Sequence, residues 1–245
     1  MKLLGIDNNA KTIKGQRKGY RTAIMYLAPS NVSGAGNTCT SASKGCRNSC
    51  LYLSGRGRMN PIQEARINKT KFFFNNPEEF LLQLEKETAA FIKSSNKKDL
   101  IPCERLNGTS DVKWEDILFD DGLNIFQKFP ELQFYDYTKH FSRAIKFAKG
   151  ELPSNYHLTF SRSENTSDEQ VVTLLGLGVN VAVVYENELP AQDFGGWEVI
   201  NGDESDLRFK DKQAKIVGLI YKNTPASEEE KGDFVRKPLQ LELAA

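Results

Sequence analysis

The sequence predicts an α/β protein whose parallel strands and helices form a full or partial (β/α) barrel. After an irregular N-terminal third, short apolar runs alternate with segments of helical periodicity. Strands that are apolar on both faces are typical of a parallel sheet covered by helices. Polar residues also follow the end of each candidate strand, as they do at the active face of parallel α/β folds. An open, doubly wound sheet is the alternative.

The length of 245 residues fits a single large domain, and 39% hydrophobic residues are sufficient for a sizeable core. We predict a basic N-terminal arm at residues 1–21 and one barrel-like domain at residues 22–245. The formal net charge of +1 argues against a generic nucleic-acid or membrane binder. The basic run at residues 11–21 could still contact phosphates, or it could be a solvated arm. No apolar stretch approaches the length of a membrane span.

The expected elements follow from the apolar pattern. The first strand is expected at residues 22–29, where Pro29 stops an apolar run. A helix is expected to begin at Asn76, with Pro77 in its first turn. The remaining candidate strands are residues 100–106, 132–137, 156–160, 179–185, 197–200 and 215–220. The remaining candidate helices are residues 114–129, 140–149 and 167–177. Thr166 and Glu169 form a candidate capping box for the last helix.

The polar residues that follow the strands include candidates for binding a substrate. Arginine can pair bidentately with a carboxylate or a phosphate, and a carboxylate could hold a ribose, a cation or an amine. A single carboxylate in such a loop more often caps a turn. The substrate-binding candidates are Arg105, Asp136, Lys139, Asp203, Asp206 and Arg208. No residue is assigned a catalytic role, because no nucleophile–base signature is present.

A long Gly-, Ser- and Asn-rich loop at residues 30–58 carries three cysteines, Cys39, Cys46 and Cys50, with the spacing C-x6-C-x3-C. Loops of this length are usually functional or held by something other than a core. No secretory signal is visible, which predicts a cytoplasmic protein. In that reducing compartment, cysteines more often bind metal, react or pack in the core than form disulfides. Three thiolates on one flexible loop can wrap a single metal centre.

Three cysteine ligands favour a [4Fe–4S] cluster with one open iron. A zinc site and cysteines that bind no metal are the less favoured alternatives. A structural zinc site normally has four ligands, usually in C-x2–4-C pairs, and only Cys46 and Cys50 have that spacing. Zinc could complete its set with Cys103, His140 or His157. Cys103 lies inside an apolar run, so we favour a core position for it and leave a fourth-ligand role open.

Two basic residues lie among the three cysteines. Lys44 and Arg47 flank Cys46 in the sequence. Positive charges lower thiol pKa values and offset the negative charge of a thiolate-bound cluster. We therefore expect these two side chains to assist the metal centre.

The loop resembles the three-cysteine loop of radical S-adenosylmethionine (radical SAM) enzymes, which follows the first barrel strand. The usual spacing there is C-x3-C-x2-C, and wider first gaps occur in divergent members. An aromatic residue usually precedes the third cysteine, whereas here Ser49 precedes it and Tyr52 follows. The resemblance implies a radical-SAM-like barrel and an oxidoreductase, transferase or lyase that uses S-adenosylmethionine and an electron donor. The residues that would bind this cofactor are Asn107, Thr109, Ser110, Asp111 and Arg162.

The chain as a whole resembles a bacteriophage family, the "gene product eighty-eight"-like proteins. The resemblance spans roughly residues 20–235. It rests on the cysteine loop, the segment RLNGTSD at residues 105–111, and NGDESDLRF at residues 201–209 followed by Val-Gly-Leu at 217–219. It implies a phage-encoded protein in the cytoplasm of the infected host cell. It implies no particular reaction or substrate.

Two other function classes remain open. In the first, a metal pins the long loop, and residues 11–21 with Arg47, Arg56 and Arg58 bind nucleic acid without S-adenosylmethionine chemistry. In the second, the protein is a hydrolase or transferase of the plain barrel type, with structural cysteines. The missing nucleophile and phosphate-loop motifs make this last class the least favoured.

Overall fold

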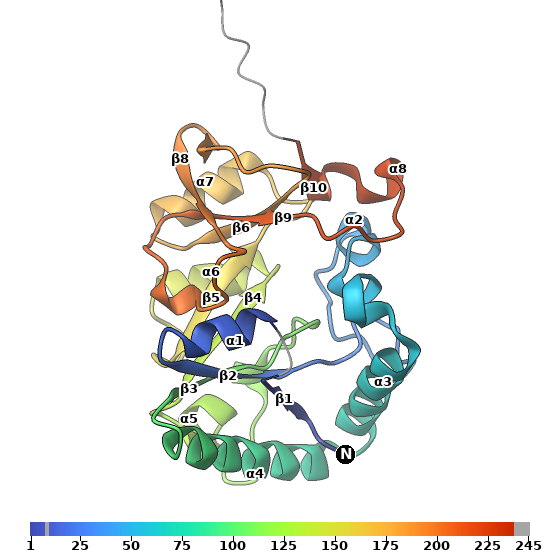
Figure 1. The fold of residues 1–245 in the computed structure, drawn as a ribbon, viewed down its shortest axis with the longest axis vertical. Coiled ribbons are helices and arrows are strands. Elements are labelled where there is room, and N and C mark those ends of the chain that lie inside the picture. Colours follow the sequence, from blue (N-terminus) through green and yellow to red (C-terminus); the bar gives the residue numbers. More distant parts are fainter. Residues whose placement is uncertain (8–9, 238–245) are drawn as a thin grey trace, which may run out of the picture.

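A computed structural model describes residues 1–7 and 10–237. Ten strands in this part of the chain form one sheet (Figure 1). The strands are β1 (Leu4–Ile6), β2 (Tyr20–Met25), β3 (Ile101–Arg105), β4 (Gln133–Thr138), β5 (Tyr156–Ser161), β6 (Val181–Tyr185), β7 (Gln192–Asp193), β8 (Trp197–Asn201), β9 (Ile216–Ile220) and β10 (Val235–Arg236). Their order is β1-β2-β3-β4-β5-β6-β9-β8-β7, and β10 pairs with β6.

The sheet is mostly parallel and open. Strands β2 to β6 lie side by side in chain order, β9 and β8 continue in parallel, and β1 and β7 pair antiparallel at the two ends. Across the described residues, no pairing joins one end of the sheet to the other. The predicted α/β class and parallel sheet are confirmed. A closed barrel is wrong, because the first and last strands remain separate edges.

Both α-helices and 3-10 helices pack on the strands of the sheet. The α-helices are α1 (Ala10–Gln16), α2 (Lys44–Asn48), α3 (Asn60–Asn75), α4 (Pro77–Asn96), α5 (Ile125–Lys128), α6 (Phe141–Ala148), α7 (Asp168–Gly176) and α8 (Glu228–Lys231). The 3-10 helices are η1 (Leu51–Leu53), η2 (Gly55–Arg58), η3 (Trp114–Asp116), η4 (Arg208–Lys210) and η5 (Gly232–Phe234). Helix α4 packs on β3, α6 on β4 and β5, and α7 on β6, whereas α1 packs on β2 and η4 on β4 and β5.

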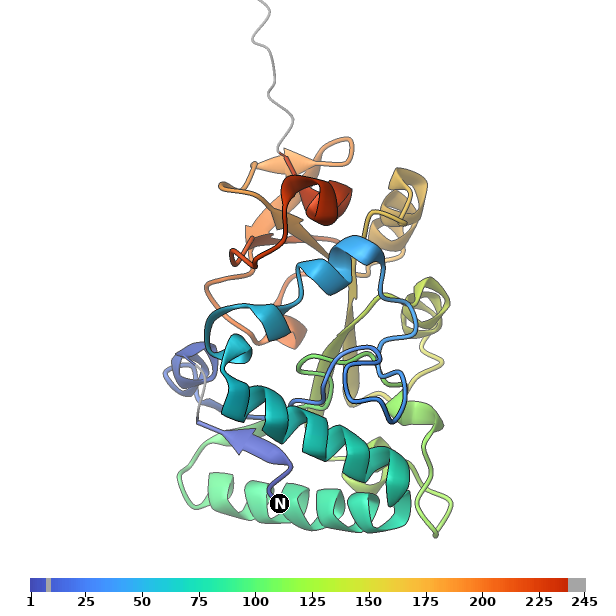
Figure 2. The same ribbon diagram turned by 90° about the vertical axis from the view of Figure 1, so that its right-hand side faces the viewer.

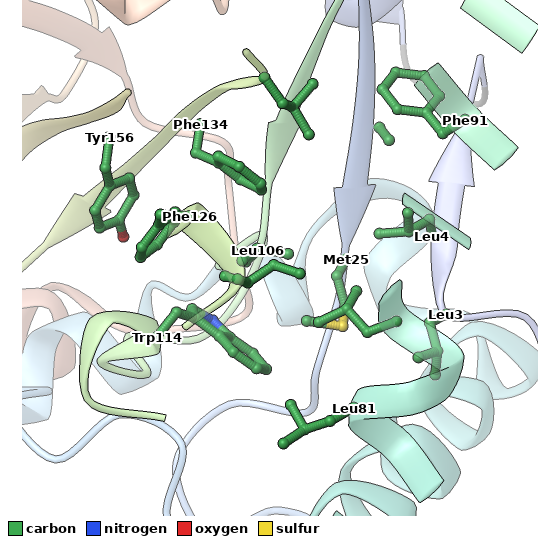
Figure 3. Packing of buried hydrophobic residues seen from close by; sticks show 14 of the residues in the cluster. Leu3, Leu4, Met25, Leu81, Phe91, Leu106, Trp114, Phe126, Phe134 and Tyr156 are labelled. Carbon is green, nitrogen blue, oxygen red and sulfur yellow. The ribbon is translucent and has the colours of Figure 1, made fainter. Parts of the chain in front are cut away.

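The main apolar core lies between the first half of the sheet and its helices (Figure 3). Phe126 stacks on Tyr156 with ring centroids 4.0 Å apart and meets Phe134 edge-on at 4.9 Å. Trp114 and Phe80 extend the same cluster towards α4. Burying rings of this size stabilises the fold by the removal of apolar surface from water. No helix in the described ranges is both long and apolar enough to cross a membrane.

Two expected helical features differ in the structure. Residues 114–129 form η3 and α5 with a turn between them, because Gly122 adopts a positive φ of 78° and Leu118 bridges to Asn124. The capping box of α7 is Ser167 with Gln170, one residue after the expected pair. Thr166 is not free to cap, because its hydroxyl accepts a hydrogen bond from the backbone N–H of Ser163.

The segment expected as a basic arm, residues 1–21, contributes β1 and α1. Arg21 is buried, and its guanidinium lies 2.8 Å from a carboxylate oxygen of Asp7. The last residues of the predicted domain, 238–245, lie outside the described part of the chain. Helix α3 was not expected from the sequence.

Candidate metal centre

Cys39, Cys46 and Cys50 line a single cavity of about 420 Å³. The cavity lies at the carboxyl ends of the parallel strands, since its other walls come from residues at or just after the ends of β2 to β6 and β9. The segment that carries the cysteines, with its short helices, crosses in front of these strand ends (Figure 2). All four cysteines of the chain are free thiols. The loop therefore brings the three predicted ligands to one place.

Each of these three cysteines is held in a different way. The thiol of Cys39 lies 3.7 Å from the carbonyl oxygen of Thr109. Cys46 lies on α2, and its backbone N–H donates to the hydroxyl of Ser43, the N-cap residue. Cys50 immediately precedes η1. The three positions thus depend on the strand-end loop after β3 and on two short helices.

Burial keeps the thiols protonated. It raises the pKa of Cys39 and Cys46 and raises the pKa of Cys50 to about 12. A metal must therefore displace protons on binding. Lys139 is the cation that most lowers the pKa of Cys46, ahead of Arg47. Lys44, which the sequence also suggested as a helper, is exposed.

The arrangement of the donors is not that of a site for a single metal ion. In residues 1–7 and 10–237, no three Cys, His, Asp or Glu side chains stand close enough together to hold one metal ion. A zinc ion needs its sulfur ligands about 2.3 Å away, whereas a cluster offers each thiolate a different iron, so its ligands stand further apart. Cys39, Cys46 and Cys50 around one cavity are the residues that would hold such a cluster.

The candidates for a fourth zinc ligand do not line this cavity. Cys103 is fully buried on β3, where its thiol lies 3.2 Å from the hydroxyl of Thr22. His140 lies against Ser41, with Nδ1 2.8 Å from the hydroxyl oxygen. His157 is on β5. A core position for Cys103 accounts for its high pKa of about 12, which burial causes.

Eight of the polar candidates line the same cavity as the cysteines: Arg105, Asn107, Thr109, Ser110, Asp111, Lys139, Asp203 and Asp206. The polar residues that follow the predicted strands therefore include much of the cavity wall. Four of these residues belong to the loop after β3, which forms the floor of the cavity.

The loop after β3 is fixed by its own hydrogen bonds. The side-chain oxygen of Asn107 accepts from the Ser110 hydroxyl at 2.8 Å and from the Val112 N–H at 2.9 Å. Thr109 donates to the carbonyl oxygen of Leu27 at 2.6 Å. Because these polar groups are already paired, the loop can present a defined surface to a ligand, but few of its side chains are free to bind one.

Asp111 joins this loop to α6. One carboxylate oxygen accepts from the backbone N–H of Lys139 at 2.7 Å, and the other lies 3.1 Å from Arg143. Arg143 also donates two bonds of 2.6 Å to Glu115 and is 2% exposed. Bidentate pairing of this kind is strong and geometrically specific. Asp111 therefore fixes the floor of the cavity instead of standing free within it.

Two ion pairs also lie at the cavity wall. Arg105 lies 2.7 Å from Asp206, and Lys222 lies 3.0 Å from Asp203. The guanidinium of Arg105 also lies over the ring of Tyr137, 5.2 Å from its centroid. Within the described residues, Nε of Arg105 has no hydrogen-bond partner. This nitrogen is enclosed by the protein, so it is an unsatisfied buried donor at the cavity wall.

Three of the predicted binding residues do not line the cavity. Asp136 is fully buried beneath it, where its carboxylate accepts from the Asn107 N–H, and burial raises its pKa to about 6. Arg162 donates to the carbonyl oxygen of Asp233. Arg208 is 1% exposed and bonds within its own turn to Ser205. All three serve the surrounding scaffold.

Glu164 is a site residue that the sequence did not single out. Its carboxylate accepts from the Ser43 hydroxyl and from the Gly45 N–H, both at 2.6 Å. It therefore binds the first turn of the helix that carries Cys46, where negative charge is favourable. The only local signal was its place in the polar cluster after β5, because its partners are more than a hundred residues away.

The C-terminal segment completes the wall around α2. Tyr221 and Phe234 line the cavity, and Cys46 packs against their apolar cluster. Asn48 donates to the carbonyl oxygen of Glu230 and accepts from the Thr224 hydroxyl through its own carbonyl oxygen. Sequence periodicity gave no sign that these distant segments meet.

The fold and the cavity define an α/β protein with a three-cysteine site at the carboxyl ends of its strands. A family model described as "Gene product 88" matches residues 1–237. The chain therefore belongs to the gene product 88 family, as its sequence resemblance predicted. Comparisons with curated proteins and with solved structures found no match.

Proposed function

We propose that this protein binds a [4Fe–4S] cluster through Cys39, Cys46 and Cys50 and leaves one iron open. The supporting observation is that three free thiols from separate turns line one strand-end cavity. The loop that carries them lacks an apolar core of its own, and a cluster would bind its turns together. Burial of the thiols suits a centre whose charge is to be shielded from water.

We further propose a radical-SAM-like enzyme, as the cysteine loop suggests. When bound, the open iron of such a cluster supplies a site for S-adenosylmethionine and, with an external electron donor, its reductive cleavage. The guanidinium of Arg105, which lines the cavity, would bind a carboxylate or phosphate of a ligand. The loop after β3, rigid through Asn107, would position that ligand. The open sheet is compatible with the partial barrel that this class implies.

Metal analysis tests the cluster. Protein purified without oxygen should contain about four irons and four sulfides per chain and absorb in the visible range. Cys46→Ala should lose them, whereas Cys103→Ser, a change on β3 away from the cavity, should retain them. Stoichiometric zinc, or no metal in the wild-type protein, would refute the proposal.

Cofactor chemistry needs a separate assay. Reduced protein should cleave S-adenosylmethionine and release 5′-deoxyadenosine, and Arg105→Met should weaken binding of the cofactor or substrate. A cluster-containing protein that neither binds nor cleaves S-adenosylmethionine would leave the cluster proposal intact and exclude the radical-SAM-like activity.

Nucleic-acid binding is the second candidate. Residues 8–63 contain no Asp or Glu, although Lys and Arg recur along the whole stretch. Lys14, Arg17 and Lys18, near α1, and Arg56 and Arg58 in η2 are exposed. Such a surface should bind DNA or RNA with an affinity that falls steeply with salt. An affinity that does not change with salt concentration, or no binding at low salt, would exclude this function.

A further inference from the structure

Most charged groups around the cysteine cavity are paired. Asp206 is paired with Arg105, Asp203 with Lys222, and Asp111 with Arg143. Lys139 also lines the cavity. Among the ion pairs of the described residues, none includes Lys139. The cavity wall therefore carries one positive charge that no carboxylate within ion-pair distance neutralises.

The ammonium group of Lys139 is held in place by neutral acceptors. It donates to the Ser161 hydroxyl at 2.8 Å and to the carbonyl oxygens of Ser161 and Arg162, both at 3.3 Å. An ammonium group has three donors, so these bonds use all of them. Lys139 therefore has no donor left for a ligand, but its charge remains, because neutral acceptors orient a charge without cancelling it.

Lys139 and Cys46 meet the same aromatic side chain. The ammonium lies 4.9 Å from the ring centroid of Phe234, and Cys46 packs against the cluster that contains Phe234. The position is partly buried, and charges interact more strongly away from water than on the surface. A charge fixed here therefore acts on Cys46 through space.

We propose that Lys139 is a positioning residue that supplies a fixed positive counter-charge to a cluster bound at Cys46 and thereby raises its reduction potential. The inference rests on the proposed function. A cluster held by three thiolates is anionic, and one-electron reduction makes it more so. A nearby positive charge stabilises the reduced form over the oxidised form. Lys139 would thus favour acceptance of an electron from the external donor.

The test compares three variants of the cluster-loaded protein. Lys139→Met removes the charge, Lys139→Arg keeps it, and Lys44→Met removes a lysine that is closer to Cys46 in sequence but exposed. Iron and sulfide content is measured first, and the midpoint potential is then measured by a dithionite titration followed by electron paramagnetic resonance. We expect a lower potential for Lys139→Met, and near wild-type values for Lys139→Arg and Lys44→Met.

The outcomes separate this inference from the proposed function. Wild-type protein without iron refutes the cluster itself. Normal iron content with an unchanged potential in Lys139→Met refutes only the role of Lys139. Cluster loss in Lys139→Met but not in Lys139→Arg supports a need for the positive charge. Cluster loss in both variants indicates that the cavity needs the size and shape of the lysine side chain, and it overturns the inference. Lys139→Gln replaces Lys139→Met if the latter does not fold.

Discussion

Glu104 should make the stability of the protein fall as pH rises. This residue lies on β3 with no exposed surface, on the sheet face opposite to Cys103 and Arg105. Its carboxyl group accepts a hydrogen bond from the Thr88 hydroxyl, at 3.2 Å from the nearer oxygen. Burial raises its pKa from the usual 4.5 to about 8. The folded protein therefore contains a neutral carboxylic acid at neutral pH.

The size of the effect follows from this pKa difference. Between pH 4.5 and pH 8 the folded state keeps the proton that the unfolded state releases, so the free energy of unfolding falls as pH rises through this range. A difference of about 3.5 pH units corresponds to about 5 kcal/mol. Below pH 4.5 both states are protonated and above pH 8 both are ionised, so the contribution of Glu104 becomes constant.

Glu104→Gln should remove this slope, because the amide stays neutral at every pH. At pH 5 the variant should be less stable than the wild-type protein by about 1–3 kcal/mol, since part of the amide lacks a partner. At pH 9 it should be the more stable of the two. Urea unfolding from pH 5 to 9, followed by the fluorescence of the buried Trp114, measures both curves. Parallel curves would refute the neutral buried acid.

Two further variants test the walls of the cavity. Glu164→Gln replaces charge-assisted hydrogen bonds from Ser43 and Gly45 with neutral ones. The variant should lose about 1–2 kcal/mol of the free energy of unfolding and bind less iron. A melting temperature and an iron content equal to those of the wild-type protein would contradict this role. Arg143→Met leaves the partly buried carboxylates of Asp111 and Glu115 without their ion-pair partner. It should cost about 3–5 kcal/mol in urea unfolding at pH 7, and a loss below about 1 kcal/mol would contradict this account.

The strands of the sheet were predictable because their signal is local. An apolar run such as β6 or β9 is recognisable from a few neighbouring residues. Strand β10 has two residues and depends on its partner β6, so the sequence carried too little information to identify it. Helix α3 lacks a clear apolar stripe. Its Thr70 accepts a hydrogen bond from the Ala28 N–H, a contact between distant parts of the chain that no local pattern encodes.

The candidate site was predictable in part for the same reason. The three cysteines are close in sequence, and the polar strand ends meet because parallel strands share an edge. Asp136, predicted as a binding residue, is buried and does not line the cavity, and strand alternation explains its place. Tyr137 lines the cavity, and adjacent residues of a strand point to opposite faces, so Asp136 faces the core. Glu164 and Phe234 reach α2 from distant parts of the chain, and no local pattern encodes such contacts.

The cavity combines a rigid floor with a wall of short segments. The floor is the loop after β3, which Asp111 and Arg143 tie to α6. The wall is the cysteine segment, whose short helices depend on Glu164 and the C-terminal segment. Short helices have little stability of their own, so a bound cluster would stabilise the wall far more than the floor. Changes at Arg143 should therefore mainly reduce folding stability, whereas changes at Glu164 should mainly reduce metal content.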